Sequence, residues 1–219
     1  MLLARAAYAG DPLRVYKTIE TDHFIIYYWA PRGDEAALDD VAHRIGVVAE
    51  RAHQLLTPVL DHVPAQKTLI YVTDDTDSAN GFASVLPRNA IQLNATSPPG
   101  SSELDDYDDW LFGLVAHEYT HILHLDTMSG LPTIYNTIFG KTWAPNQIMP
   151  RWLIEGIAVN EESDRSAGGR NRGTRFDAWI RIARHEHKDL RLDEATGSPR
   201  QFPHGNAAYV YGSHFLGYV

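Results

Sequence analysis

The chain has 219 residues, of which 44% are hydrophobic, 21% charged and 11% aromatic, a composition that fits one globular domain over 1–219. Its formal net charge of −9 argues against a nucleic-acid partner, because such proteins usually carry a basic patch or stripe. Cysteine is absent, which excludes disulfides and cysteine-ligated metal sites. No stretch approaches the roughly 18 apolar residues of a membrane-spanning helix, so we expect no transmembrane segment.

The first hundred residues predict a strand-rich part built around one helix. Residues 14–29 are rich in β-branched and aromatic residues and predict one or two strands. Apolar residues recur at helical spacing over 34–60, which predicts an amphipathic helix that ends near Pro58. The apolar run 67–75 predicts a short strand, and 80–96 predicts a hairpin of two short strands around a proline-containing turn.

The second half of the chain is predominantly helical in pattern. It predicts helices over 108–125, 150–163, 175–188 and 205–219, an irregular connector over 130–150, and loops over 97–106 and 168–173. Strands with one helix, followed by a helical part, predict an α+β fold in which 1–100 is strand-rich and 101–219 is helical.

The two ends of the chain indicate a piece of a longer protein. Residues 205–219 predict a helix that stops without a capping glycine or polar tail, so we expect further chain after residue 219. Residues 1–12 hold an apolar run that is short for a signal peptide but fits the trimmed end of one. The compartment stays open, with a periplasmic or secreted protein favoured.

Residues 114–126, LVAHEYTHILHLD, place two histidines four positions apart with a glutamate directly after the first. Positions i and i+4 lie on one face of a helix, so His117 and His121 can present both imidazoles to one cation. Glu118 is rotated about 100° from His117, so it borders the metal and can accept a proton from a zinc-bound water. The same five-residue pattern also arises by chance, so a third ligand decides between the two readings.

A candidate third ligand lies in RWLIEGIAVNEES, where Glu155 stands among apolar residues. A carboxylate in such surroundings is costly to bury unless it is paired or bound to a metal. The alternative is an exposed glutamate in the first turn of a helix, near the favourable end of the dipole. Asp126 is a weaker candidate, because five residues after His121 a side chain points away from both histidines. His124 serves as neither ligand nor base in this interpretation.

HEYTH followed by WLIEGIA resembles the gluzincin metallopeptidases, the zincins that include thermolysin-like and aminopeptidase N-like enzymes and share a W-L-x-E-G-x-A segment. It is most similar to the bacterial peptidase MA-like domains, which often precede a β-propeller. The resemblance implies a zincin-like fold and one Zn²⁺ held by His117, His121 and Glu155, with Glu118 as general base. The long spacing between His121 and Glu155 implies an insertion over 132–149.

The resemblance also implies a role for Glu162, which lies seven residues after Glu155 on the same helical face. It would accept a hydrogen bond from a zinc-binding histidine, and the alternative is a solvated charge. The aminopeptidase N-like pattern Tyr-x-x-Gly matches Tyr209 with Gly212, which makes Tyr209 the implied hydrogen-bond donor to the oxyanion. The alternative donors are Tyr211, His204 and His214.

The hairpin predicted over 80–96 would supply the edge strand that pairs with the substrate backbone. It lacks the acidic exopeptidase signature of the aminopeptidases, which favours an endopeptidase. The sequence therefore predicts a zinc metallopeptidase acting on a peptide or protein substrate. The alternatives are a non-catalytic, zinc-stabilised interaction module of a larger multidomain protein, a metal-free helical binding domain, and hydrolysis of another bond by the same zinc chemistry.

Overall fold

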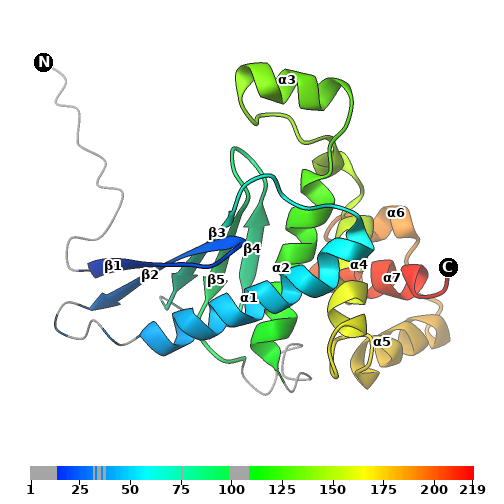
Figure 1. Ribbon diagram of the computed structural model, residues 1–219. Coiled ribbons are helices and arrows are strands. Elements are labelled where there is room, and N and C mark those ends of the chain that lie inside the picture. The colour runs from blue at the N-terminus through cyan, green and yellow to red at the C-terminus, as the bar shows by residue number, and fades with distance from the viewer. Residues whose placement is uncertain (1–13, 32, 34–35, 37, 75, 99–108) are drawn as a thin grey trace, which may run out of the picture.

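The computed structural model describes residues 14–31, 33, 36, 38–74, 76–98 and 109–219. The N-terminal segment 1–12 and most of the loop predicted over 97–106 lie outside these residues. The described chain has the predicted α+β composition, with a mixed sheet formed by the N-terminal part and helices in the C-terminal half (Figure 1). Among the described residues, no helix is long and apolar enough to cross a membrane.

Five strands form one sheet in the order β1-β2-β3-β5-β4. They are β1 (Arg14–Glu20), β2 (Phe24–Pro31), β3 (Thr68–Thr73), β4 (Gly81–Ser84) and β5 (Ala90–Asn94). β2, β3 and β5 are parallel, whereas β1 and β4 run antiparallel to their neighbours. The predicted hairpin is confirmed, residues 14–29, for which one or two strands were predicted, fall in the two strands β1 and β2, and β4 forms one edge of the sheet.

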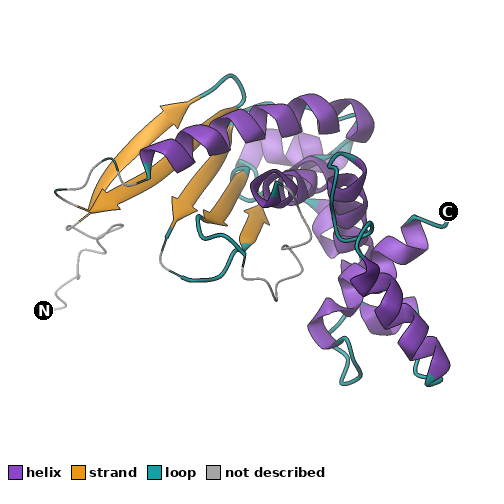
Figure 2. Ribbon diagram, turned by 90° about the horizontal axis from the view of Figure 1, so that it is seen from below, coloured by secondary structure: helices purple, strands orange, loops and turns teal. Residues whose placement is uncertain are grey.

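Helix α1 (Asp39–Leu60) crosses one face of the sheet and packs against it (Figure 2). Its buried side includes Ile45, Ala49 and Leu56, which join Phe24, Ile26, Ile70 and Ile91 of the sheet in the main core. The helix runs through Pro58 and ends at Leu60, and it is followed by Asp61, whose φ of 48° is left-handed. Because Pro58 lies in the last turn, its missing N–H removes one hydrogen bond without breaking the helix.

Helix α2 (Trp110–Asp126) runs between the sheet and the C-terminal helices (Figure 1). The Asp109 side chain caps it by accepting a hydrogen bond of 3.3 Å from the backbone N–H of Phe112. The remaining helices are α4 (Arg151–Asp164), α5 (Thr174–His185), α6 (Leu192–Ala195) and α7 (Ala207–Leu216), with a 3₁₀ turn at His204–Asn206. A second apolar cluster joins α4, α5 and α7.

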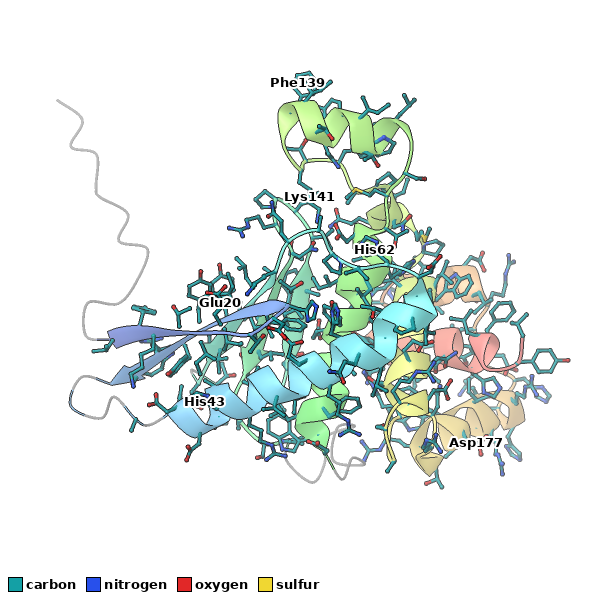
Figure 3. All side chains as sticks on the ribbon, viewed as in Figure 1. Glu20, His43, His62, Phe139, Lys141 and Asp177 are labelled. Carbon is teal, nitrogen blue, oxygen red and sulfur yellow. The ribbon has the colours of Figure 1, made fainter. Side chains whose placement is uncertain are left out.

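The prediction of an irregular connector over 130–150 is wrong for much of the segment. It contains the nine-residue helix α3 (Leu131–Phe139) and a 3₁₀ turn at Pro145–Ile148. Helix α3 projects from the body and buries none of its residues, and Phe139 lies at its outer side (Figure 3). Apolar residues do recur at helical spacing in α3 (Leu131, Ile134, Tyr135, Ile138 and Phe139), but the segment is short and contains or adjoins Gly130, Pro132 and Gly140, which favour the prediction of an irregular connector.

Asp126, at the end of α2, anchors the base of this projection. Its side chain accepts hydrogen bonds from Asn89 Nδ2 (2.9 Å) and His62 Nε2 (3.0 Å), and it forms an ion pair with Lys141. Lys141 lies beneath α3 (Figure 3). Burial raises the pKa of Asp126, but the hydrogen bonds from His62, Lys141 and Asn89 outweigh it and hold this pKa below its usual value.

We therefore expect Asp126→Asn to lower the free energy of unfolding by about 2–3 kcal/mol at pH 7, because it leaves Lys141 without its counter-ion. A lowered carboxyl pKa contributes stability that is present above the ordinary pKa and is lost as pH falls through the folded-state pKa. The deficit relative to wild type is thus larger at pH 7 than at pH 3, as urea unfolding would measure.

The matched control is Asp177→Asn, which removes an exposed ion pair with Arg181 on α5 and should change the stability by less than about 1 kcal/mol. Equal losses in the two variants would contradict the anchoring role of Asp126.

Candidate metal centre

Two helices bring three potential ligand atoms together. His117 Nε2 and His121 Nε2, both on α2, lie 3.2 Å apart. Glu155, on α4, places Oε2 at 3.2 Å from His121 Nε2 and 3.5 Å from His117 Nε2. The Glu155 side chain is only 12% exposed, so it is not the solvated helix-end glutamate of the alternative interpretation. The three residues form a buried group that could hold a metal ion.

The dimensions of this group fit a tetrahedral divalent cation. Ligand atoms about 2.0–2.1 Å from a tetrahedral zinc lie roughly 3.3 Å from one another, and the three edges here measure 3.2, 3.2 and 3.5 Å. Glu155 Oε2 is buried and accepts no hydrogen bond among the described residues. An unsatisfied buried carboxylate oxygen is costly, and a cation between it and the two histidines would satisfy it.

The far side of His117 is held by Glu162. Glu162 Oε2 lies 2.8 Å from His117 Nδ1, and the Glu162 side chain is completely buried, so it is not a solvated charge. This contact directs Nε2 of the same ring toward His121 and Glu155, as carboxylates commonly do for metal-binding histidines. Arg170 in turn donates from Nε to Glu162 Oε1 and from Nη2 to Glu162 Oε2, each at 2.7 Å.

The ionisable side chains of this group shift one another's pKa values. Burial raises the pKa of Glu162, but the Arg170 guanidinium and His117 lower it to about 2. Burial and Arg170 lower the pKa of His117, whereas Glu155 and Glu162 raise it to about 9. Glu155 likewise has its pKa held far below the usual range, because the two histidines outweigh its burial. Both carboxylates are therefore ionised, as a metal site requires, and a metal ion binding at His117 would release the proton that its raised pKa favours.

Glu118 is 5% exposed and lies beside the ligand group, where it lines the same cleft. Burial raises the pKa of Glu118, opposed by His117 and His121. The edge strand β4 reaches this carboxylate at Gly81, where a Cβ atom would lie 2.6 Å from Glu118 Cγ and 2.7 Å from Oε1. Only glycine leaves room at this point of the strand for the side chain of Glu118.

The cleft in front of these residues has a volume of about 900 Å³. Its walls come from β4, α2, α4, α5 and α7, and its lining includes Phe82, Leu114, Arg151, Ile154, Trp179 and Tyr209. A pocket of this size, with a few polar groups converging on an apolar wall, is typical of small-molecule and peptide sites.

Tyr209 faces the cleft from α7. Its ring stacks on that of His117 with centroids 6.0 Å apart, and its hydroxyl lies 3.5 Å from Arg151 Nη2. Arg151 also donates from Nε to Glu155 Oε1 over 3.3 Å, so it links the phenol to the carboxylate. Burial and the charge of Glu155 raise the pKa of Tyr209 to about 12, which keeps the hydroxyl protonated and able to donate.

The other candidates suggested by the sequence lie elsewhere. The Tyr211 hydroxyl accepts a hydrogen bond of 3.2 Å from the backbone N–H of Leu190, away from the cleft. His204 and His214 are exposed and do not line it. His124 is outside the ligand group, and Asp126 is held by the anchoring contacts beneath α3.

Two glycines bring α4 and α7 into backbone contact and so position Tyr209. A Cβ on Gly212 would overlap the carbonyl oxygen of Trp152, and one on Gly156 would lie 2.6 Å from the carbonyl carbon of Gly212. Since Tyr209 is nearly one turn before Gly212, this close approach sets the phenol against the ligand group. Gly81, Gly156 and Arg170 were not identified from the sequence as parts of the site.

No protein-family model and no curated protein matches this chain. The geometry and chemistry of the site therefore carry the functional argument.

Proposed function

We propose that this chain is a zinc-dependent metallopeptidase domain of the gluzincin type, with a zincin-like fold, that hydrolyses peptide bonds within a peptide or protein. The observation that carries the proposal is the triangle of His117, His121 and Glu155, whose edges fit tetrahedral zinc, with Glu118 next to it. An endopeptidase fits better than an aminopeptidase, because the β4 hairpin lacks the acidic residue that grips a free N-terminus.

Zinc bound by His117, His121 and Glu155 would lower the pKa of a water molecule and polarise the scissile carbonyl. Glu118 would accept the proton of that water and deliver it to the leaving amine. The protonated Tyr209 hydroxyl would donate a hydrogen bond to the carbonyl oxygen as negative charge develops there. Glu162, fixed by Arg170, keeps the His117 ring in its orientation throughout.

The edge strand supplies a surface for the substrate backbone. Gly81, Phe82 and Ala83 of β4 line the cleft, and in the part of the chain that the structure describes β4 pairs with β5 alone. An extended peptide can therefore add to the open edge of the sheet, which would carry its backbone past Glu118.

Two features favour an enzyme over the alternative of a non-catalytic, zinc-stabilised module. A structural zinc site is closed by four protein ligands, whereas the group among the described residues has three. Glu118 is buried beside them but forms no hydrogen bond or ion pair within the described part of the chain. A carboxylate that borders the ligand group and opens onto the cleft is suited to take up a proton from a metal-bound water.

We expect Glu118→Gln to retain zinc and to lower the rate of peptide hydrolysis by roughly 100-fold or more, because the amide cannot act as a base. Zinc content would be measured by elemental analysis and hydrolysis with an internally quenched peptide library. The control is Glu161→Gln, which removes a carboxylate of α4 paired with Arg165 and should leave the rate unchanged. Hydrolysis by Glu118→Gln at the wild-type rate would exclude this mechanism.

We expect Gly81→Ala to lower the turnover number by roughly 10- to 100-fold while zinc stays bound, because the new methyl group displaces Glu118 from its position by part of an ångström or more. Gly197→Ala, at a site where a Cβ meets no atom within 4 Å, is the control. If Gly81→Ala retained full activity, the close contact between β4 and Glu118 would have no bearing on catalysis.

A further inference from the structure

Helix α3 presents an apolar face to solvent. The helix buries none of its residues, and its large apolar side chains are between 43% and 73% exposed. They recur at helical spacing and so share one side of the helix: Leu131, Ile134, Tyr135, Ile138 and Phe139. Phe139 lies on the side away from the body and Lys141 on the side toward it (Figure 3). An exposed apolar face of this kind marks an interaction site.

Side-chain contacts close the turn after α3 and fix the projection to the body. Asn136 Oδ1 accepts hydrogen bonds from the backbone N–H groups of Thr142 (3.1 Å) and Trp143 (3.0 Å), and Asn136 Nδ2 donates to the Trp143 carbonyl over 2.7 Å. At the base, Lys141 is paired with the buried Asp126. The apolar side chains are therefore presented by a structure with defined contacts.

The segment that carries this face is almost without charge. Residues 127–150 contain one charged residue, Lys141, whereas 21% of the whole chain is charged. The ammonium group of Lys141 is itself paired with Asp126. Surfaces that bind another protein usually have a polar rim around their apolar centre, whereas a charge that enters lipid is costly. The lack of charge over the whole segment therefore fits contact with lipid.

Polar side chains of the projection form hydrogen bonds within it. Thr137 Oγ1 donates to the Thr133 carbonyl over 2.8 Å, and Asn136 uses both its oxygen and its nitrogen in the turn. Hydrocarbon offers no hydrogen-bond partners, so a structure that enters it has to pair its polar groups internally. Tyr135 and Trp143, whose rings are 5.8 Å apart, each join an apolar ring to a polar group, and such side chains gather where lipid meets water.

We propose that α3 inserts its apolar face into the surface of a lipid bilayer and so attaches the protein to a membrane. The helix has nine residues and is therefore about 14 Å long. This is less than half of the about 30 Å of a bilayer's hydrocarbon core, so α3 enters one leaflet and lies close to the interface. The attachment is independent of the proposed peptidase function, since α3 supplies no residue to the ligand group or its cleft.

Flotation of the full chain with phosphatidylcholine vesicles in a density gradient tests the proposal. We expect the protein to float with the vesicles and to stay bound in high salt, because apolar burial drives the insertion and salt screens only charges. Tryptophan fluorescence should shift to shorter wavelength and be quenched by phosphatidylcholine with brominated acyl chains. Trp143→Phe should remove most of both signals, although the chain has five tryptophans.

The double variant Ile134→Gln, Ile138→Gln should weaken partitioning into vesicles by roughly 10- to 100-fold, because two apolar side chains no longer enter the lipid. Both side chains are exposed and glutamine is a good helix former, so the circular dichroism spectrum should not change. The matched control is Val47→Gln, Ile182→Gln, which alters apolar residues of α1 and α5 that are 72% and 56% exposed. It should float as the wild type does.

A wild-type protein that does not float with the vesicles, or a double variant that floats equally well, would overturn the proposal. Release from the vesicles in high salt would also contradict it, because it would show a contact made by charge. Sedimentation velocity without lipid tests the alternative that a second copy of the chain covers the face. A wild-type dimer that becomes monomeric in the Ile134→Gln, Ile138→Gln variant would establish that alternative and reject the membrane contact.

Discussion

The contact of Glu155 with His117 and His121 is the constraint on which the site depends. It brings a carboxylate and two imidazoles within 3.2–3.5 Å in a buried place, where unpaired charge is costly. Such a group persists only if both helices that carry it are held firmly. Helix α2 is almost entirely buried between the sheet and the C-terminal helices, and α4 is fixed by its backbone contact with α7.

Close contacts also position the residues that surround the ligand group. Glycine allows β4 to reach Glu118 at Gly81, and it allows α4 and α7 to touch at Gly156 and Gly212. The Glu162–Arg170 pair orients His117 from behind. Each of these contacts restricts the position of one functional side chain, and catalysis commonly requires such positions to be held to within a fraction of an ångström.

Much of the ligand group could be predicted from the sequence, because it depends on local spacing. The helical repeat alone places His117 and His121 on one face, and the apolar neighbours of Glu155 marked it as a carboxylate with a partner. Arg170 and Gly81 could not be found in this way. Their roles come from contacts with Glu162 and Glu118, which are formed by tertiary packing and leave no periodic pattern in the chain. The helix α3 was missed for a different reason: its apolar residues do recur at helical spacing, but the segment has only nine residues and stands among Gly130, Pro132 and Gly140, which are typical of loops.

The most direct test of the account is the zinc content of the purified protein, measured by elemental analysis after dialysis against metal-free buffer. The account predicts one zinc ion per wild-type chain and a loss of bound zinc in Glu155→Ala, since two histidines alone hold the ion weakly. A wild-type chain without zinc, or a Glu155→Ala chain that keeps one zinc per chain, would contradict the assignment of the His117, His121 and Glu155 centre.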